Sequence, residues 1–207
     1  MRVLVTGATG GLGSALARAL AGQELFLSGR RAGSLLDLAR EVGGRALPAD
    51  LTDELSAKAL LEEVGPLDLL LHAVGVAGRS PVREVGRVAL EEMLAAHLLT
   101  AVFLLKHARF SRGARAVFFG AYPTYVRVPG FAPYAAAKGA LEAYLEAARK
   151  EMAREGVSLV LVRLPAVATG LWTPLGGPPK GALSPEEAAK RVLEGVLREP
   201  PPALLEV

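Results

Sequence analysis

Short apolar runs alternate with amphipathic stretches along the whole chain. The apolar runs predict strands at 2–6, 24–29, 45–49, 67–75, 114–120, 157–164 and 201–207. In the stretches between them, hydrophobic residues recur with helical spacing, which predicts helices at 11–22, 32–43, 52–65, 88–110, 131–155 and 184–199. The run at 67–75 is apolar without alternation, which is typical of a strand covered on both faces.

This alternation of strand and helix predicts an α/β fold. We expect one domain over 1–207, a Rossmann-type, doubly wound parallel sheet of about seven strands with helices on both faces. Thr52 or Asp53 is expected to cap one helix, and Ser184 followed by Pro185 to begin another. The Pro- and Gly-rich segment 169–185 contains no predicted element, and we expect a flexible loop over a site there.

Composition narrows the possible compartments and ligands. Hydrophobic residues make up 51% of the chain, yet no uninterrupted apolar run reaches the ~18 residues of a membrane span. The N-terminal run is too short for a targeting segment, so we expect a cytoplasmic protein without membrane contact. There is no cysteine, and the three histidines lack zinc-site spacing, so no metal site is expected. The scarcity of amide side chains and the many arginines suggest a thermostable protein, although biased codon usage would leave the same composition.

Charge gives little support to a nucleic-acid partner. The formal net charge is +3 and the sequence pI is about 9.4, but the basic residues are scattered, with no long basic block. Nucleic-acid surfaces concentrate Lys and Arg on one face. We therefore expect no nucleic-acid binding.

The glycines of "TGATGGLG" lie between the first strand and the first helix. Gly7, Gly11 and Gly13 allow a tight turn and a close approach of the backbone to a ligand. The unpaired N–H groups at the start of a helix, with its positive dipole end, suit a pyrophosphate. A glycine-rich structural turn is the alternative, but the position between strand and helix favours a dinucleotide site.

Residues at the end of the second strand indicate whether the dinucleotide is NAD or NADP. An acidic residue there would accept hydrogen bonds from a ribose 2′-hydroxyl, and this chain has Gly29 followed by Arg30 and Arg31. Guanidinium groups suit a 2′-phosphate, which favours NADP over NAD. One of the two arginines could instead be a solvated surface residue.

Tyr134 and Lys138 are spaced so that both side chains share one face of the predicted helix 131–155. A phenol beside an ammonium group can act as an acid/base pair. The alternative is a packed aromatic residue followed by a solvated lysine.

Together, the glycine loop and the Tyr134–Lys138 pair resemble the short-chain dehydrogenase/reductase family over nearly the whole chain. "HAVG" (72–75) occupies the place of the family's N-N-A-G, and Pro165–Ala166 the place of its Pro-Gly. The resemblance implies coenzyme contacts at Gly7, Thr9, Gly10, Gly11, Leu12, Gly13, Arg30, Arg31, Asp50, Leu51, Ala73, Val74, Gly75, Tyr134, Lys138, Pro165, Ala166, Val167 and Thr169.

The resemblance also implies a reaction. Tyr134 would exchange a proton with a carbonyl or alcohol oxygen of a small substrate while the nicotinamide exchanges hydride at carbon. Lys138, together with the charge of the nicotinamide, would lower the pKa of Tyr134 from its usual value near ~10. We therefore expect an NADP(H)-dependent oxidoreductase.

Two parts of the family's usual site are replaced. Ala121 stands where the family has a catalytic serine, and His97 stands where it has an asparagine. His97 is either a catalytic residue that holds a structural water or a backbone carbonyl, or a core histidine that is hydrogen-bonded by the backbone. Tyr122 or Thr124 could supply the missing hydroxyl. The competing hypothesis is a non-catalytic NADP(H)-binding sensor or interaction protein with a degenerate active site.

Other residues are expected to shape the protein around this site. His72 is expected to be structural, and His107 to be exposed or at an interface. We expect apolar walls at Leu171, Trp172 and Leu175, although Trp172 could instead pack the loop down. By analogy with the family, the two long helices are expected to pair subunits into a homodimer or homotetramer. The stripe Leu141, Leu145, Ala148 and Met152 could belong to that interface or to the core.

Overall fold

The computed structural model describes residues 1–207 as a seven-stranded sheet in the order β3-β2-β1-β4-β5-β6-β7. Every neighbouring pair of strands is parallel. The strands are β1 (Arg2–Thr6), β2 (Glu24–Gly29), β3 (Arg45–Pro48), β4 (Leu67–His72), β5 (Phe110–Ala121), β6 (Ser158–Leu164) and β7 (Leu204–Glu206). The predicted fold class is confirmed.

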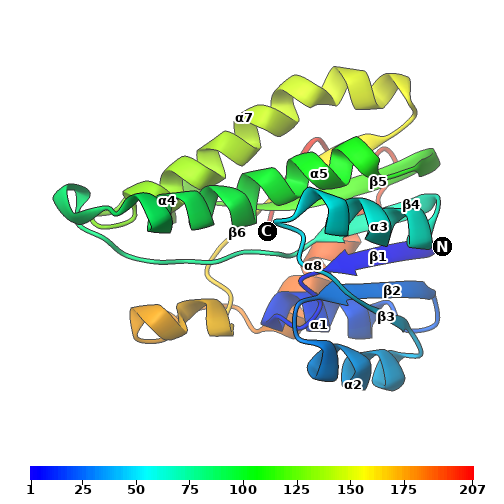
Figure 1. Ribbon diagram of the computed structural model, residues 1–207, viewed down its shortest axis with the longest axis horizontal. Coiled ribbons are helices and arrows are strands. Elements are labelled where there is room, and N and C mark those ends of the chain that lie inside the picture. Colours follow the sequence, from blue (N-terminus) through cyan, green and yellow to red (C-terminus); the bar gives the residue numbers. More distant parts are fainter.

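Helices cover both faces of the sheet (Figure 1). One face carries α1 (Gly11–Ala19), α2 (Ala32–Val42) and α8 (Pro185–Val196). The other face carries α3 (Glu54–Val64), α4 (Arg87–Leu94), α5 (Thr100–His107) and α7 (Ala132–Arg154). The short elements are η1 (Val82–Glu84), η2 (Ala95–Leu99), α6 (Pro123–Val126) and η3 (Gly170–Leu175). The strand order reverses between β1 and β4, and in such sheets ligands bind at the carboxyl ends of the strands beside this point.

The predicted long helix 88–110 differs from the structure in two ways. It is interrupted by the π-helical turn η2, and it ends at His107, because the chain from Phe110 onward pairs with β4 as the start of β5. Pairing across the sheet therefore overrides the helical pattern of the last residues. The stretch Arg87–His107 is long and apolar enough to cross a membrane by length and composition alone. In the fold it packs against α3 and α7, with Ala101 and Leu104 fully buried.

The apolar stripe on α7 belongs to the core. Leu141, Leu145 and Met152 are buried in the cluster formed with β4, β5 and α5, and Ala148 packs against them. Of the two alternatives for this stripe, core and interface, the structure shows the core.

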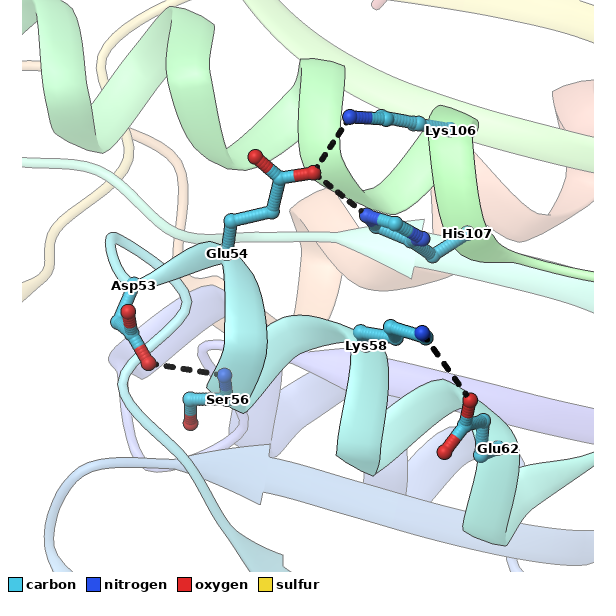
Figure 2. Close-up of polar contacts among 7 residues, drawn as sticks. All are labelled: Asp53, Glu54, Ser56, Lys58, Glu62, Lys106 and His107. Carbon is cyan, nitrogen blue, oxygen red and sulfur yellow. Dashed lines mark hydrogen bonds and ion pairs between the residues drawn. The ribbon is translucent and has the colours of Figure 1, made fainter.

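Polar contacts fix the start of α3 against the end of α5 (Figure 2). Asp53 caps α3 by accepting a hydrogen bond from the Ser56 N–H. Glu54 Oε1 lies 2.6 Å from Lys106 Nζ and 2.8 Å from His107 Nε2. His107 was predicted to be exposed or at an interface; it is half-buried within the chain because it pairs with Glu54.

Candidate active site

The glycine loop crosses the carboxyl end of β1 with almost no space beside its backbone. Gly7 has a φ of 68°, and a Cβ there would lie 2.6 Å from the Ala73 carbonyl oxygen. A Cβ on Gly13 would lie 2.2 Å from the Gly7 carbonyl oxygen. The helix α1 begins after Gly10 with no side-chain cap, so its first N–H groups face outward from a bare turn. Such a turn fits the pyrophosphate of a dinucleotide, as the sequence predicts.

This loop opens into a cavity of about 720 Å³. Fifteen of the predicted site residues line it: Thr9, Gly10, Gly11, Leu12, Arg31, Ala73, Val74, Gly75, His97, Tyr134, Lys138, Pro165, Ala166, Val167 and Thr169. The cavity also contacts residues that the sequence analysis missed: Val76, Ala77, Tyr125, Val126, Phe131 and Pro174. These lie in loops and in the short helix α6, where sequence periodicity gives no signal.

Five predicted coenzyme contacts do not line the cavity. Gly7 and Gly13 shape the turn from within its backbone. Leu51 is 4% exposed and packs in the core, and Asp50 accepts hydrogen bonds from both the backbone and the hydroxyl of Thr52. Arg30 is the fifth.

Arg31 is the cavity's cation at the end of β2. Its Nη2 donates to the Thr9 carbonyl oxygen over 2.6 Å, which holds the guanidinium beside the glycine loop. Gly29 leaves room here, since a Cβ at that position would lie 3.3 Å from Thr9 Oγ1. Of the two predicted arginines, the structure brings Arg31 to the cavity.

Tyr134 and Lys138 stand one turn apart on α7 and both line the cavity. Lys138 Nζ lies 5.6 Å from the centre of the Tyr134 ring and donates to the Phe119 carbonyl oxygen over 2.7 Å. Only 8% of Tyr134 and 9% of Lys138 is exposed, so the interpretation of Lys138 as a solvated surface lysine is wrong.

Burial shifts the pKa values of Tyr134 and Lys138 in the direction that favours the neutral form of each side chain. Desolvation raises the pKa of Tyr134 to about 12 and lowers that of Lys138 to about 8. The predicted lowering of the Tyr134 pKa is therefore not present in the protein alone, because desolvation of the phenolate dominates. Tyr134 is held as a protonated phenol, which is the form of a proton donor.

His97 sits in the π-helical turn, 2% exposed, with its ring 5.3 Å from that of Tyr134. Its Nε2 lies 2.8 Å from the Val76 carbonyl oxygen and 3.4 Å from the Val76 nitrogen. We assign the proton to Nε2, because the shorter contact is to a carbonyl that can only accept. Burial lowers the pKa of His97, so the ring is neutral, and its Nδ1 has no partner. His97 thus holds a backbone carbonyl, which both of its predicted roles include.

His72 forms a buried hydrogen-bonded chain. Thr100 Oγ1 donates to the Ala96 carbonyl oxygen, so it accepts from His72 Nε2 at 2.9 Å. His72 Nδ1 then accepts from the Thr6 hydroxyl at 2.7 Å. The chain ties the π-helical turn to β1 and β4, which agrees with the predicted structural role of His72.

This arrangement predicts a pH dependence of stability. Burial lowers the pKa of His72 from 6.5 to about 3 in the folded protein. Below pH 6.5, His72 therefore becomes protonated in the unfolded chain but stays neutral in the folded chain. The contribution of neutral, buried His72 to the free energy of unfolding is complete above pH 6.5 and falls by about 1.4 kcal/mol per pH unit below it. Urea unfolding of wild type and His72→Gln at pH 7.5, 6 and 5 checks this. The variant is expected to show the shallower loss, and parallel pH profiles would contradict the assignment.

Neither predicted substitute for the missing serine reaches the cavity. Tyr122 donates its hydroxyl to the Val207 carbonyl oxygen at 3.2 Å, and Thr124 is exposed. Tyr125 lines the cavity instead, 50% exposed, and Ala121 presents only a methyl group. Tyr134 is therefore the phenol within the cavity, and Tyr125 lies at its rim.

The loop 169–185, predicted to contain no helix or strand, carries one short helix. It contains the helix η3, whose N-cap Thr169 accepts from the Leu171 N–H, and Trp172 Nε1 donates to the Val167 carbonyl oxygen over 2.8 Å. Leu171 and Trp172 line the cavity as expected, and Leu175 packs behind it against the cluster around Tyr134. Trp172 has both of its predicted roles, because it anchors the loop and forms a wall.

Known proteins resemble this chain in sequence. A family model described as short chain dehydrogenase matches residues 1–177. The chain belongs to the short-chain dehydrogenase family. A gluconate 5-dehydrogenase of Gluconobacter oxydans is 31% identical over 76% of this chain and 68% of its own length. A 7beta-hydroxysteroid dehydrogenase of Clostridium sardiniense is 31% identical over 82% of this chain and 70% of its own.

Solved structures also resemble the chain closely. A crystal structure described as a short-chain oxidoreductase from Thermus thermophilus has a TM-score of 0.93 and 79% identity, and each chain is covered completely. BdcA, crystallised in complex with NADPH, has a TM-score of 0.89 at 21% identity, over 99% of this chain and 91% of its own. The second likeness shows the fold alone. As a short-chain dehydrogenase, the chain is an oxidoreductase of a family that binds nicotinamide coenzymes.

Proposed function

We propose that this short-chain dehydrogenase is an NADP(H)-dependent oxidoreductase that interconverts a small carbonyl compound and its alcohol. The observation that carries the proposal is that Tyr134 and Lys138 line the same cavity as the bare glycine turn and Arg31. A pure nucleotide-binding module has no use for a protonated phenol buried at the inner end of that cavity.

Each residue has a defined task in this proposal. The turn at Gly10–Leu12 would hold the pyrophosphate, and Arg31 a 2′-phosphate. The bound nicotinamide would supply hydride to the carbonyl carbon. Tyr134 donates its hydroxyl proton to the carbonyl oxygen, so that C–H and O–H bonds replace the C=O π bond. Lys138 donates a hydrogen bond to the Phe119 carbonyl oxygen, and its ammonium form would stabilise the phenolate that remains.

Two further expectations belong to this proposal. The chain would act without a metal or a nucleic acid, in the cytoplasm. Two or four copies would pair through the two long helical segments, Arg87–His107 and α7. The alternative, a non-catalytic NADP(H)-binding protein, is favoured by Ala121, which gives the site no serine hydroxyl.

Coenzyme preference tests the proposal at Arg31. Loss of one charge-assisted contact costs about 1.5–3 kcal/mol, so Arg31→Ala should weaken NADPH binding about 10- to 100-fold and leave NADH nearly unchanged. Arg40→Ala is the matched control, because Arg40 is exposed on α2 and pairs with Asp37 away from the cavity. Thermal-shift titrations with both coenzymes, followed by NADPH oxidation with a carbonyl panel, make the measurement. Saturable NADPH binding without turnover of any carbonyl would favour the sensor alternative.

A further inference from the structure

The charged side chains of the cavity are both held by the protein's own carbonyl oxygens. Arg31 Nη2 donates to the Thr9 carbonyl oxygen beside the glycine loop, and Lys138 Nζ donates to the Phe119 carbonyl oxygen of β5. The cavity has no other charged side chain in its lining. In the proposed function Arg31 serves the coenzyme at the glycine loop and Lys138 serves the phenolate of Tyr134, so neither cation is assigned to an anionic group on a substrate.

Around Tyr134 the walls are apolar. Val76, Ala77, Ala121, Val126 and Phe131 pack in or against the cluster that contains Tyr134. The helix η3 adds Leu171, Trp172 and Pro174 to the lining of the same cavity. Tyr134 itself packs in a buried cluster with Met93, Val126 and Phe131. The site of proton donation is thus enclosed by hydrocarbon.

The polar side-chain atoms in these walls are mostly engaged. His97 Nε2 binds the Val76 carbonyl, and Trp172 Nε1 binds the Val167 carbonyl. His97 Nδ1 is sealed from solvent within the protein. Besides Tyr134, the lining carries three hydroxyls. Thr9 lies beside Gly29 at the glycine loop, Thr169 accepts from the Leu171 N–H as the N-cap of η3, and Tyr125 is 50% exposed at the rim. The interior therefore offers a substrate one side-chain hydrogen bond, at the reacting oxygen.

We propose that the substrate is an apolar ketone or aldehyde, or the matching alcohol, whose reacting oxygen is the only polar group that enters the cavity. A hydroxyl or carboxylate elsewhere on the buried part would lose its hydration and find no free side-chain partner beside Tyr134. This inference rests on the proposed function and deepens it, since it separates apolar carbonyl compounds from sugars and sugar acids.

A methyl-for-hydroxyl pair of substrates tests the inference. 4-Methylcyclohexanone and 4-hydroxycyclohexanone have nearly the same shape, and 5-ketogluconate adds charge and more hydroxyls. With NADPH, kcat/KM is expected to be about 10²-fold higher for the methyl compound, the discrimination typical of a hydrophobic pocket against an added hydroxyl. The keto acid is expected to be poorer still. Equal or reversed values of kcat/KM would overturn the inference and leave the proposed function standing.

Two valines close in sequence provide matched variants, one at the end of α6 and one just after it. Val126 is 8% exposed, lines the cavity and packs against Tyr134, whereas Val128 is 36% exposed and lies outside the cavity lining. Val126→Thr keeps the shape and adds a hydroxyl, so it should reduce the methyl-over-hydroxyl ratio about tenfold, while Val128→Thr should not change it. A ratio that responds to neither variant would contradict the assignment of this wall.

A binding measurement keeps the inference testable without turnover. Trp172 is the only tryptophan in the chain and lines the cavity, so its fluorescence reports ligands there. In the presence of coenzyme, 4-methylcyclohexanol is expected to bind more tightly than 1,4-cyclohexanediol. Tighter binding of the diol would overturn the inference. Absence of turnover with every carbonyl, together with the expected binding order, would instead count against the proposed reaction alone.

Discussion

Tyr134→Phe is expected to lower kcat for carbonyl reduction by about 10²–10⁴-fold, the usual contribution of a positioned general acid. The effect should fall near the upper end of that range because Ala121 supplies no second hydroxyl and neither Tyr122 nor Thr124 lines the cavity. Coenzyme affinity should change little, since the ring and its packing are retained. Steady-state kinetics and NADPH titration of the same preparation measure the two quantities.

Tyr125→Phe is the matched control for that experiment. It removes a hydroxyl from the same cavity, but from a half-exposed side chain at the rim. Its kcat should stay within a few-fold of wild type. If both variants lose activity equally, or if Tyr134→Phe keeps the wild-type rate, Tyr134 is not the proton donor.

Gly7→Ala is expected to destabilise the protein by about 2–5 kcal/mol. A left-handed residue with a Cβ costs about 1–2 kcal/mol, and overpacking adds about 1–3 kcal/mol. At Gly7 both terms apply, because φ is 68° and the added Cβ would lie 2.6 Å from the Ala73 carbonyl oxygen. The variant should also lose NADPH binding, because the added Cβ would displace the glycine loop. Urea unfolding with and without coenzyme measures both effects.

Gly22→Ala isolates the conformational part of that cost. Gly22 has a φ of 91°, and nothing lies within 4 Å of the Cβ it would carry. Its destabilisation should be about 1–2 kcal/mol, with NADPH binding intact. Equal losses in the two variants would mean that the contact between Gly7 and Ala73 is not tight.

The sequence predicted the sheet because buried parallel strands and amphipathic helices have different periods. It also predicted most of the residues around the glycine loop, since a turn between β1 and α1 can be recognised from its glycines. It did not predict that the helix after β4 contains a π-helical turn or ends at His107, because those features depend on contacts with β1, β4 and β5.

The substrate side of the site was harder to predict. Val76, Tyr125 and Val126 lie in irregular segments whose direction depends on tertiary packing. The sequence showed that the serine position holds Ala121, but which neighbouring hydroxyl faces the cavity depends on α6. The lowering of the Tyr134 pKa was predicted for the site with Lys138 and a charged nicotinamide. In the protein alone burial raises this pKa, which the sequence could not show, because the spacing to Lys138 reveals an adjacent charge and not the extent of burial.

The apolar surroundings of Tyr134 make the two directions of catalysis unequal. With a pKa of about 12, the Tyr134 hydroxyl carries at physiological pH the proton that carbonyl reduction would consume. Alcohol oxidation would need the deprotonated oxygen, which burial disfavours and which the charge of a bound, oxidised nicotinamide would stabilise in addition to Lys138. In the proposed reaction, alcohol oxidation would therefore depend on the positive charge of the oxidised nicotinamide more strongly than carbonyl reduction does.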